Sequence, residues 1–186
     1  MRSLSATTDR ATVARLFPDA ADYVLPEYGR APDEATMDNY FNERPPNVGA
    51  EDAVHIRMFD EDRLIGILGV VFGYPDATDS YIGLLLLAPH ALGKGVGGHA
   101  VAHAATLAKA RESTRQLVAV LDNNPKGRAF WKREGFVLEK SFLPTNDGHI
   151  RHRMTRAIYG SSGVRPLSSS VNQPASSNSV GTKGRP

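Results

Sequence analysis

A cluster of glycines between an apolar run and an alanine-rich stretch constrains this chain more than any other feature. The segment IGLLLLAPHALGKGVGG covers residues 82–98, and four of its last six residues are glycine. This order predicts a strand, a loop and the beginning of a helix. The first N–H groups of a helix have no intrahelical partner, and glycines let a bound anion approach the backbone closely. The segment therefore predicts a phosphate site or, alternatively, only close packing of the helix on the sheet.

The common phosphate-binding signatures do not identify this loop. The sequence contains no GxxxxGK[ST] motif, and it matches GxGxxG only formally, at Gly93, Gly95 and Gly98. A dinucleotide site would also need an acidic residue after a second strand to bind the ribose. No such residue stands in the expected place, and the preceding region reads as consecutive strands rather than as repeated strand–helix–strand units.

The rest of the chain predicts an α+β fold, a mixed sheet flanked by helices. A first helix is expected over residues 11–17, capped by Thr8 or Asp9 and ended by Pro18, and a second over residues 33–43. Strands are expected over residues 53–59, 64–74, 81–87, 116–122, 136–142 and 149–158, the last two as a hairpin. The remaining helices are expected from about residue 97 to 111 and from Asn124 to Gly135.

Composition separates a folded domain from a tail. Residues 160–186 hold eight serines, four glycines and three prolines, which predicts a disordered tail after a domain spanning residues 1–159. The net charge is +2, but three basic residues and no acidic ones lie in the tail, so residues 1–159 carry −1. This charge argues against a nucleic-acid partner.

Several classes of protein and site are not expected from the composition. The chain contains no cysteine, which excludes disulfides and thiolate chemistry, and no metal site is expected. No apolar stretch approaches the roughly 18–20 residues of a membrane span. The N-terminus lacks the apolar core of a signal peptide. We therefore expect a cytoplasmic protein, monomeric or homodimeric, without a membrane partner.

An acidic segment precedes the strands. Residues 16–50 hold seven acidic and two basic residues, a local charge of −5, so the rest of residues 1–159 carries +4. The segment can be a solvated helical face or a negative rim that attracts a cationic substrate. Its aromatic residues can belong to the core or line an acceptor pocket, and we name Tyr28 and Tyr40 as candidate substrate contacts.

A second motif lies downstream of the glycines. The stretch NPKGRAFWKREGF, residues 124–136, fits N-x-x-[AG]-x-x-x-[YW]-x-x-x-G-F at Asn124, Gly127, Trp131, Gly135 and Phe136. Together with the glycine loop about 30 residues upstream, it resembles the GCN5-related N-acetyltransferase (GNAT) family over roughly residues 8–158. The resemblance implies a mostly antiparallel mixed sheet that splays open beside the glycine loop, and acetyl-CoA as the acetyl donor.

The resemblance also implies where the cofactor binds. The strand before the loop would pair with the pantetheine arm through Leu85 and Leu87, with Leu86 between them. The pyrophosphate would lie on the loop, and Asn124 would bind the cofactor arm. The complete set of residues expected around the cofactor is Leu85, Leu86, Leu87, Leu92, Gly93, Lys94, Gly95, Val96, Gly97, Gly98, Asn124, Arg128, Trp131 and Lys132.

Two positions depart from the family pattern. Leu92 replaces an Arg or Gln, so Lys94, Arg128 and Lys132 are the cations expected to compensate. Trp131 replaces the tyrosine that many members use to protonate the CoA thiolate. An indole N–H cannot supply that proton usefully, so Trp131 can instead pack against the cofactor or the core.

The resemblance implies direct attack of an amine on the thioester, with a backbone N–H near Leu87 stabilising the developing oxyanion. An amine with a pKa of about 10 must lose a proton at neutral pH. Tyr81, at the position of a family glutamate, and Asp122, at a strand end, are the candidate catalytic residues; Asp122 can alternatively cap the next helix. We expect acetyl transfer from acetyl-CoA to a small cationic primary amine; the alternative is a CoA-binding protein with this fold and a regulatory or non-catalytic role.

Overall fold

The computed structural model describes residues 2–3, 6–19, 33–144 and 148–158, and Tyr28 and the expected disordered tail lie outside them. One seven-stranded sheet has the order β1-β2-β3-β4-β5-β7-β6. Its strands are β1 (Arg2–Ser3), β2 (Ala53–Asp60), β3 (Arg63–Phe72), β4 (Asp79–Leu87), β5 (Arg115–Leu121), β6 (Val137–Phe142) and β7 (Arg151–Ala157). Every neighbouring pair is antiparallel except β4 and β5. The expected mixed, mostly antiparallel sheet is confirmed.

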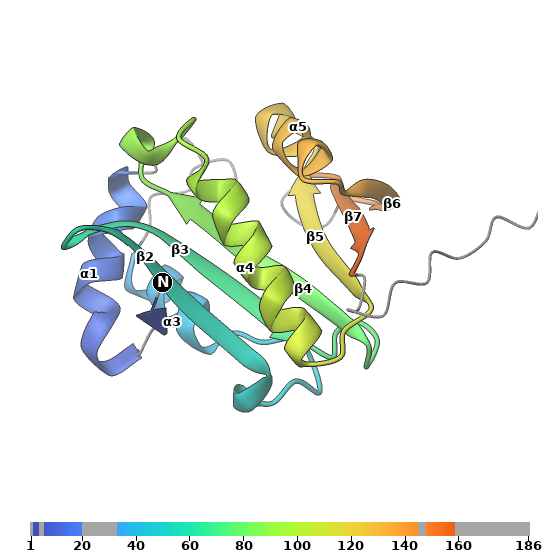
Figure 1. The fold of residues 1–186 in the computed structure, drawn as a ribbon, viewed down its shortest axis with the longest axis horizontal. Coiled ribbons are helices and arrows are strands. Elements are labelled where there is room, and N and C mark those ends of the chain that lie inside the picture. The colour runs from blue at the N-terminus through green and yellow to red at the C-terminus, as the bar shows by residue number, and fades with distance from the viewer. Residues whose placement is uncertain (1, 4–5, 20–32, 145–147, 159–186) are drawn as a thin grey trace, which may run out of the picture.

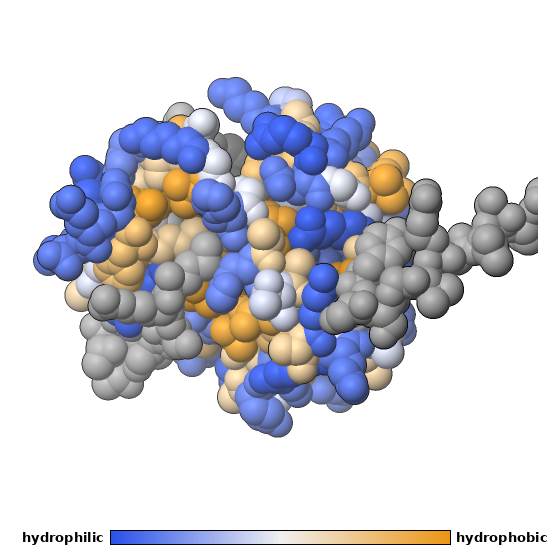
Figure 2. All heavy atoms as spheres, in the orientation of Figure 1, coloured by the Kyte–Doolittle hydropathy of each residue, from blue (hydrophilic) through white to orange (hydrophobic). Residues whose placement is uncertain are grey.

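Helices cover both faces of this sheet (Figure 1). The α-helices are α1 (Ala6–Asp19), α3 (Glu34–Asn42), α4 (Val96–Ala110) and α5 (Pro125–Arg133), and η1 (Ala50–Asp52) and η2 (Pro89–Ala91) are short 3₁₀ turns. One core cluster joins α4 and α5 to one face, and a second joins α1 and α3 to the other. The surface on the α4 side mixes hydrophilic and hydrophobic side chains (Figure 2).

Local sequence explains where several helices begin. Asp33 and Thr36 form a reciprocal capping box at the start of α3. Asn124 caps α5, with Pro125 in its first turn, where the missing N–H costs no helical bond. Alanines on α4 have no exposed surface at Ala100, Ala104 and Ala108, so small side chains let this helix pack closely on the sheet.

The expected bounds of α1 are wrong. The helix begins at Ala6, so Thr8 and Asp9 lie inside its first turn and cannot cap it. Pro18 lies in the last turn instead of following the helix. Pro18 removes one helical hydrogen bond near the end of the helix, and the helix nevertheless continues to Asp19. The two-residue strand β1 was not expected from the sequence either, because it is too short to show alternation.

Candidate active site at the splayed edge of the sheet

The sheet opens between its two parallel strands. Residues 79–82 of β4 pair with residues 115–118 of β5, but the rest of β5 pairs only with β7 among the described strands. On the other side of β4, Gly69 is opposite Leu84 and Val70 is opposite Ile82, so Gly83 is an extra residue in a β-bulge. A bulge bends its strand and increases the local twist. Residues 83–87 consequently form an open edge beside the gap.

Two leucines turn backbone groups toward this gap. The N–H of Ala88 donates to the carbonyl of Ile65 at 2.9 Å, on the β3 side. Peptide groups alternate along a strand, so the N–H and C=O of Leu85 and Leu87 face away from β3 and into the gap. The same alternation turns Leu86 to β3, and its side chain is buried in the α1–α3 core cluster. The expectation that Leu86 contacts the cofactor is therefore not supported.

The four glycines after β4 are required for different structural reasons. Gly93 and Gly95 have φ of 73° and 81°, and a Cβ built on either would meet nothing within 4 Å. Left-handed φ favours glycine, and the open space leaves room for a ligand at the start of α4. A Cβ on Gly97 would instead lie 2.9 Å from Cε2 of Phe130, and one on Gly98 would lie 3.5 Å from the Glu134 carboxylate. Gly97 is therefore explained by close packing between α4 and α5.

The three cations expected at the cofactor lie in the loop and on α5. Lys94 and Lys132 are exposed and Arg128 is half-buried. None of the three pairs with a carboxylate in the described parts of the chain, so all three charges are available to an anion. Leu92 is 59% exposed and contributes no charge, whereas Val96 packs against the α4-side core.

The two anchors of the downstream motif have clear packing roles. The Oδ1 of Asn124 accepts the N–H of Gly127 at 2.8 Å, which leaves the Nδ2 as its donor for a ligand. Trp131 is 7% exposed and lies edge-on to Phe130 and Phe136 at 4.9 and 5.2 Å. Core packing is therefore sufficient to explain Trp131.

The two expected catalytic residues lie apart from each other. Tyr81 is half-buried in the parallel-paired part of β4, and its ring lies 5.7 Å from that of Tyr74. Asp122 follows β5, where its Oδ1 accepts the N–H of Asn123 at 2.9 Å and lies 3.4 Å from Nδ1 of His149. Asn124, not Asp122, caps α5, so the alternative explanation of Asp122 as a helix cap is wrong.

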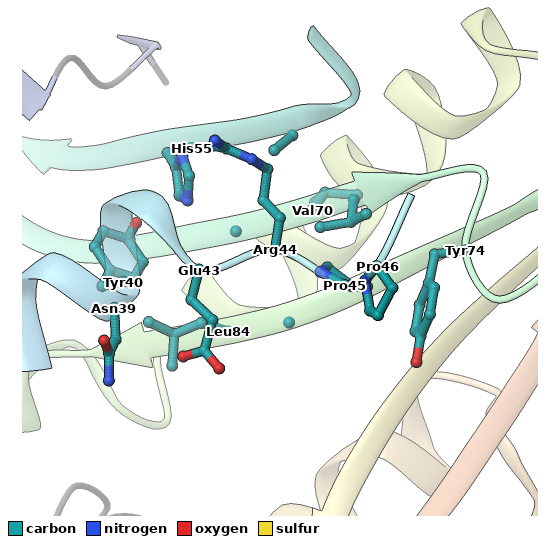
Figure 3. Close-up of a pocket in the computed structure, with 14 residues that line it drawn as sticks. Asn39, Tyr40, Glu43, Arg44, Pro45, Pro46, His55, Val70, Tyr74 and Leu84 are labelled. Carbon is teal, nitrogen blue, oxygen red and sulfur yellow. The ribbon is translucent and has the colours of Figure 1, made fainter. Parts of the chain in front are cut away.

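A cavity of about 400 Å³ opens on the α3 side of the same bulge (Figure 3). Its floor includes Gly69 of β3 and Gly83 of β4, next to Leu84. Side chains from the end of α3 and the segment after it form one wall, and β2, β3 and the segment after β3 supply the remainder. These lining residues are Asn39, Tyr40, Glu43, Arg44, Pro45, Pro46, Ala53, His55, Val70, Val71 and Tyr74. The expected substrate contact Tyr40 is among them.

One histidine extends from β2 into this cavity (Figure 3). The ring of His55 lies edge-on to Tyr40 at 4.9 Å and tilted to Phe41 at 6.0 Å. Burial lowers the pKa of His55, and the positive charge of Arg44 lowers it further, against the opposing effect of a hydrogen bond to the Tyr40 backbone. Sequence reasoning missed His55 and Gly69, because nothing in a strand pattern indicates which side chains face a cavity.

The acidic segment divides into different roles. Asp33 caps α3, and Asp38 forms an ion pair with Arg10 of α1 at 2.7 Å. Both carboxylates therefore have structural partners. Glu43 lies in the cavity wall (Figure 3). Only this member of the described part of the segment is placed at the cavity.

These features suit a cofactor with a long polar arm and a pyrophosphate. The open edge at Leu85 and Leu87 offers backbone donors and acceptors to the arm, and the space at Gly93 and Gly95 fits phosphates at a helix start.

No cluster of three or more metal-ligating side chains occurs among the described residues. Among the same residues, none of the helices has the length and apolar character that crossing a bilayer requires.

Comparison with solved structures identifies the fold. An acetyltransferase from Thermus thermophilus is 23% identical and has a TM-score of 0.69, over 83% of this chain and 94% of that one. The ribosomal-protein-S18-alanine N-acetyltransferase of Escherichia coli is 15% identical, with a TM-score of 0.63 over 88% and 97% of the two chains. An aminoglycoside 6′-N-acetyltransferase complexed with coenzyme A is 10% identical, with a TM-score of 0.63 over 86% and 98%.

The sequence itself matches a known family over the residues of the candidate site. No curated protein matches the sequence. A family model described as the acetyltransferase (GNAT) family matches residues 16–136, a span that contains the open β4 edge, the glycine loop and α5. That match covers well over half of the 186 residues. The chain belongs to the acetyltransferase (GNAT) family.

Proposed function

We propose that this protein transfers an acetyl group from acetyl-CoA to the primary amine of a small cationic molecule. The observation that carries the proposal is the open β4 edge, residues 83–87, which separates the glycine loop from the cavity at Gly83. A donor on one side of this edge and an acceptor on the other can meet at one strand. Acetyl-CoA is the cofactor of the family, and it supplies an activated acetyl thioester when bound.

The chain's own groups can hold that donor. The backbone of Leu85 and Leu87 would pair with the arm, and the Nδ2 of Asn124 would add a donor. The N–H groups from Gly93 to Gly98 would bind the pyrophosphate, assisted by Lys94, Arg128 and Lys132. A backbone N–H of the open edge would stabilise negative charge that develops on the thioester oxygen.

Glu43 is the side chain of the cavity lining that favours an amine with a positive charge, and Arg44 in the same lining opposes it. Glu43 can attract an ammonium, and the rings of Tyr40 and Tyr74 offer faces for cation–π contacts. Attraction by one partly exposed carboxylate is modest and falls with added salt.

We also propose that Tyr81 and Asp122 are catalytic groups and that Tyr28 contacts the substrate. We further predict that the protein is cytoplasmic and monomeric or dimeric. We predict no nucleic-acid or membrane partner.

A screen for thiol release tests the proposal. The purified protein is incubated with acetyl-CoA and a panel of amines that differ in charge, and acetylated products are identified by mass spectrometry. We expect stoichiometric CoA thiol and N-acetyl product with one or more cationic amines. Neutral or anionic acceptors as the preferred class would contradict the cationic substrate, and the absence of turnover with every amine would contradict the activity.

The burial of Trp131 favours one alternative. A tyrosine at this position can protonate the thiolate in many family members, and the buried indole of Trp131 cannot. A CoA-binding protein without efficient transfer would bind acetyl-CoA in calorimetry and release no thiol with any amine. The same screen, run beside calorimetry, therefore separates the two functions.

A further inference from the structure

We propose that His55 is the catalytic residue that takes a proton from the acceptor amine. This inference rests on the proposed function, because it assigns a group to the acceptor side of that reaction. Neither the glycine loop nor the downstream motif contains His55, which lies on β2, two strands away from the open edge.

Gly69, which has no side chain, lies on β3 between His55 of β2 and Leu84 of β4. His55 is opposite Gly69 on β3, and Gly69 is opposite Leu84 on β4. A Cβ on Gly69 would lie 3.6 Å from Cδ2 of His55 and 3.9 Å from Cβ of Leu84. Two strand spacings amount to about 10 Å, which an imidazole and one bound amine can span together. The missing side chain therefore leaves room for an amine between His55 and Leu84, on the strand where we place the thioester.

The surroundings fix the orientation of the imidazole. Tyr40 and Phe41 contact the ring, and its hydrogen bond to the Tyr40 backbone favours the protonated form, as expected for an N–H that donates to a carbonyl. With one nitrogen donating, the other nitrogen of a neutral imidazole is an acceptor. A neutral histidine in the cavity can therefore accept a proton.

The charged groups around the cavity agree with this role. Arg44, from the segment after α3, favours the neutral imidazole, and Glu43 beside it attracts an ammonium. Tyr40 from α3 and Tyr74 after β3 are the other titratable side chains in the lining. β3 and β4 contribute no titratable side chain to it, and neither Tyr81 nor Asp122 is among the lining residues. His55 is thus the histidine that the acceptor would meet.

The proton balance of the step is complete. The acceptor enters as an ammonium and gives one proton to His55, and the freed nitrogen lone pair attacks the carbonyl carbon of the thioester. The C–N bond forms, the C–S bond breaks, and its electron pair goes to sulfur. The nitrogen loses a second proton as the amide forms, and water carries it to sulfur to give the CoA thiol. His55 then returns its proton to solvent.

Kinetics of His55→Gln against His103→Gln test the assignment. His103 lies on α4, away from the cavity lining. Loss of a general base costs about 10²- to 10⁴-fold, so we expect kcat/KM for the amine to fall by this amount in His55→Gln, with acetyl-CoA affinity within about twofold of wild type. The wild-type kcat/KM should rise with pH through a pKa below about 6.5, and this rise should be absent from the residual activity of His55→Gln. His103→Gln should resemble the wild type in rate and profile.

A measurement on the wild-type protein does not depend on the folding of a variant. Side-chain ¹⁵N NMR of the CoA-bound protein should show the His55 imidazole neutral at pH 7 and shifted when the acceptor amine is added, while His103 does not respond. An unshifted His55 signal, or a His55→Gln variant with full activity or with an unchanged pH profile, would overturn the assignment while leaving the acetyltransferase intact. A wild-type protein that acetylates no amine would overturn the proposed function and this inference together.

Discussion

Replacing Gly95 by alanine tests the position of the phosphate site. Gly95 precedes α4 with φ of 81°, and a Cβ there would meet nothing within 4 Å. The methyl group would enter the space that we assign to the pyrophosphate. The variant therefore combines a backbone cost with the loss of a cofactor contact, and a control is needed to separate the two effects.

Gly135→Ala is that control. Gly135 has φ of 88° and also has nothing within 4 Å of a built Cβ, but it lies after α5 rather than in the loop. A left-handed conformation costs an L-residue about 1–2 kcal/mol, so both variants should lose similar free energy of unfolding. For a chain of this length the melting temperature should fall by about 2–8 °C in each.

Cofactor affinity should distinguish the two variants. A hydrogen bond to a charged group contributes about 1.5–3 kcal/mol, so losing one phosphate contact should weaken acetyl-CoA binding roughly 10- to 100-fold in Gly95→Ala. Isothermal titration calorimetry should show wild-type affinity in Gly135→Ala. Equal affinities in the two folded variants would refute the placement of the pyrophosphate at Gly95.

Three further predictions concern the cavity. Gly69→Val should fold, because valine suits a strand, and should raise KM for the amine at least about 10-fold without changing acetyl-CoA binding in calorimetry; unchanged amine kinetics would place the acceptor elsewhere. Glu43→Gln should raise KM for a cationic amine a few-fold and reduce the salt dependence of kcat/KM, and an unaltered KM would exclude Glu43 from the contact. Because folding lowers the pKa of His55, the unfolded state binds more protons below about pH 6.5, so the free energy of unfolding should decrease as pH falls from there; in His55→Gln, chemical denaturation should show a smaller decrease, and equal decreases would contradict the burial argument.

The sequence alone predicted the main elements because each has a strong local pattern. The alternation and the apolar runs indicated β2 to β5, and the alanines and Asn124 indicated α4 and α5. The glycine loop could be recognised because its residues are consecutive. The sequence could not show which of its glycines leave space for a ligand and which allow helix packing. Gly97 is explained by its contact with Phe130, which forms only when α5 packs on α4.

The acceptor side depends on contacts between distant segments. The Gly83 bulge follows from the register between β3 and β4, which sequence does not specify. The cavity joins the end of α3 to three strands, so His55 could not be recognised as a lining residue in the stretch AVHIRMF. The individual roles of the acidic residues could not be predicted either, because the ion pair of Asp38 with Arg10 requires α1 and α3 to pack together.

The central claim is that donor and acceptor meet at the open edge of β4. A crystal structure of the protein with acetyl-CoA and the amine selected by the screen tests this claim most directly. We predict that the cofactor arm lies along residues 83–87, the pyrophosphate on residues 93–98, and the amine in the cavity between His55 and Gly83. An arm bound away from β4, or an amine bound outside this cavity, would contradict the account.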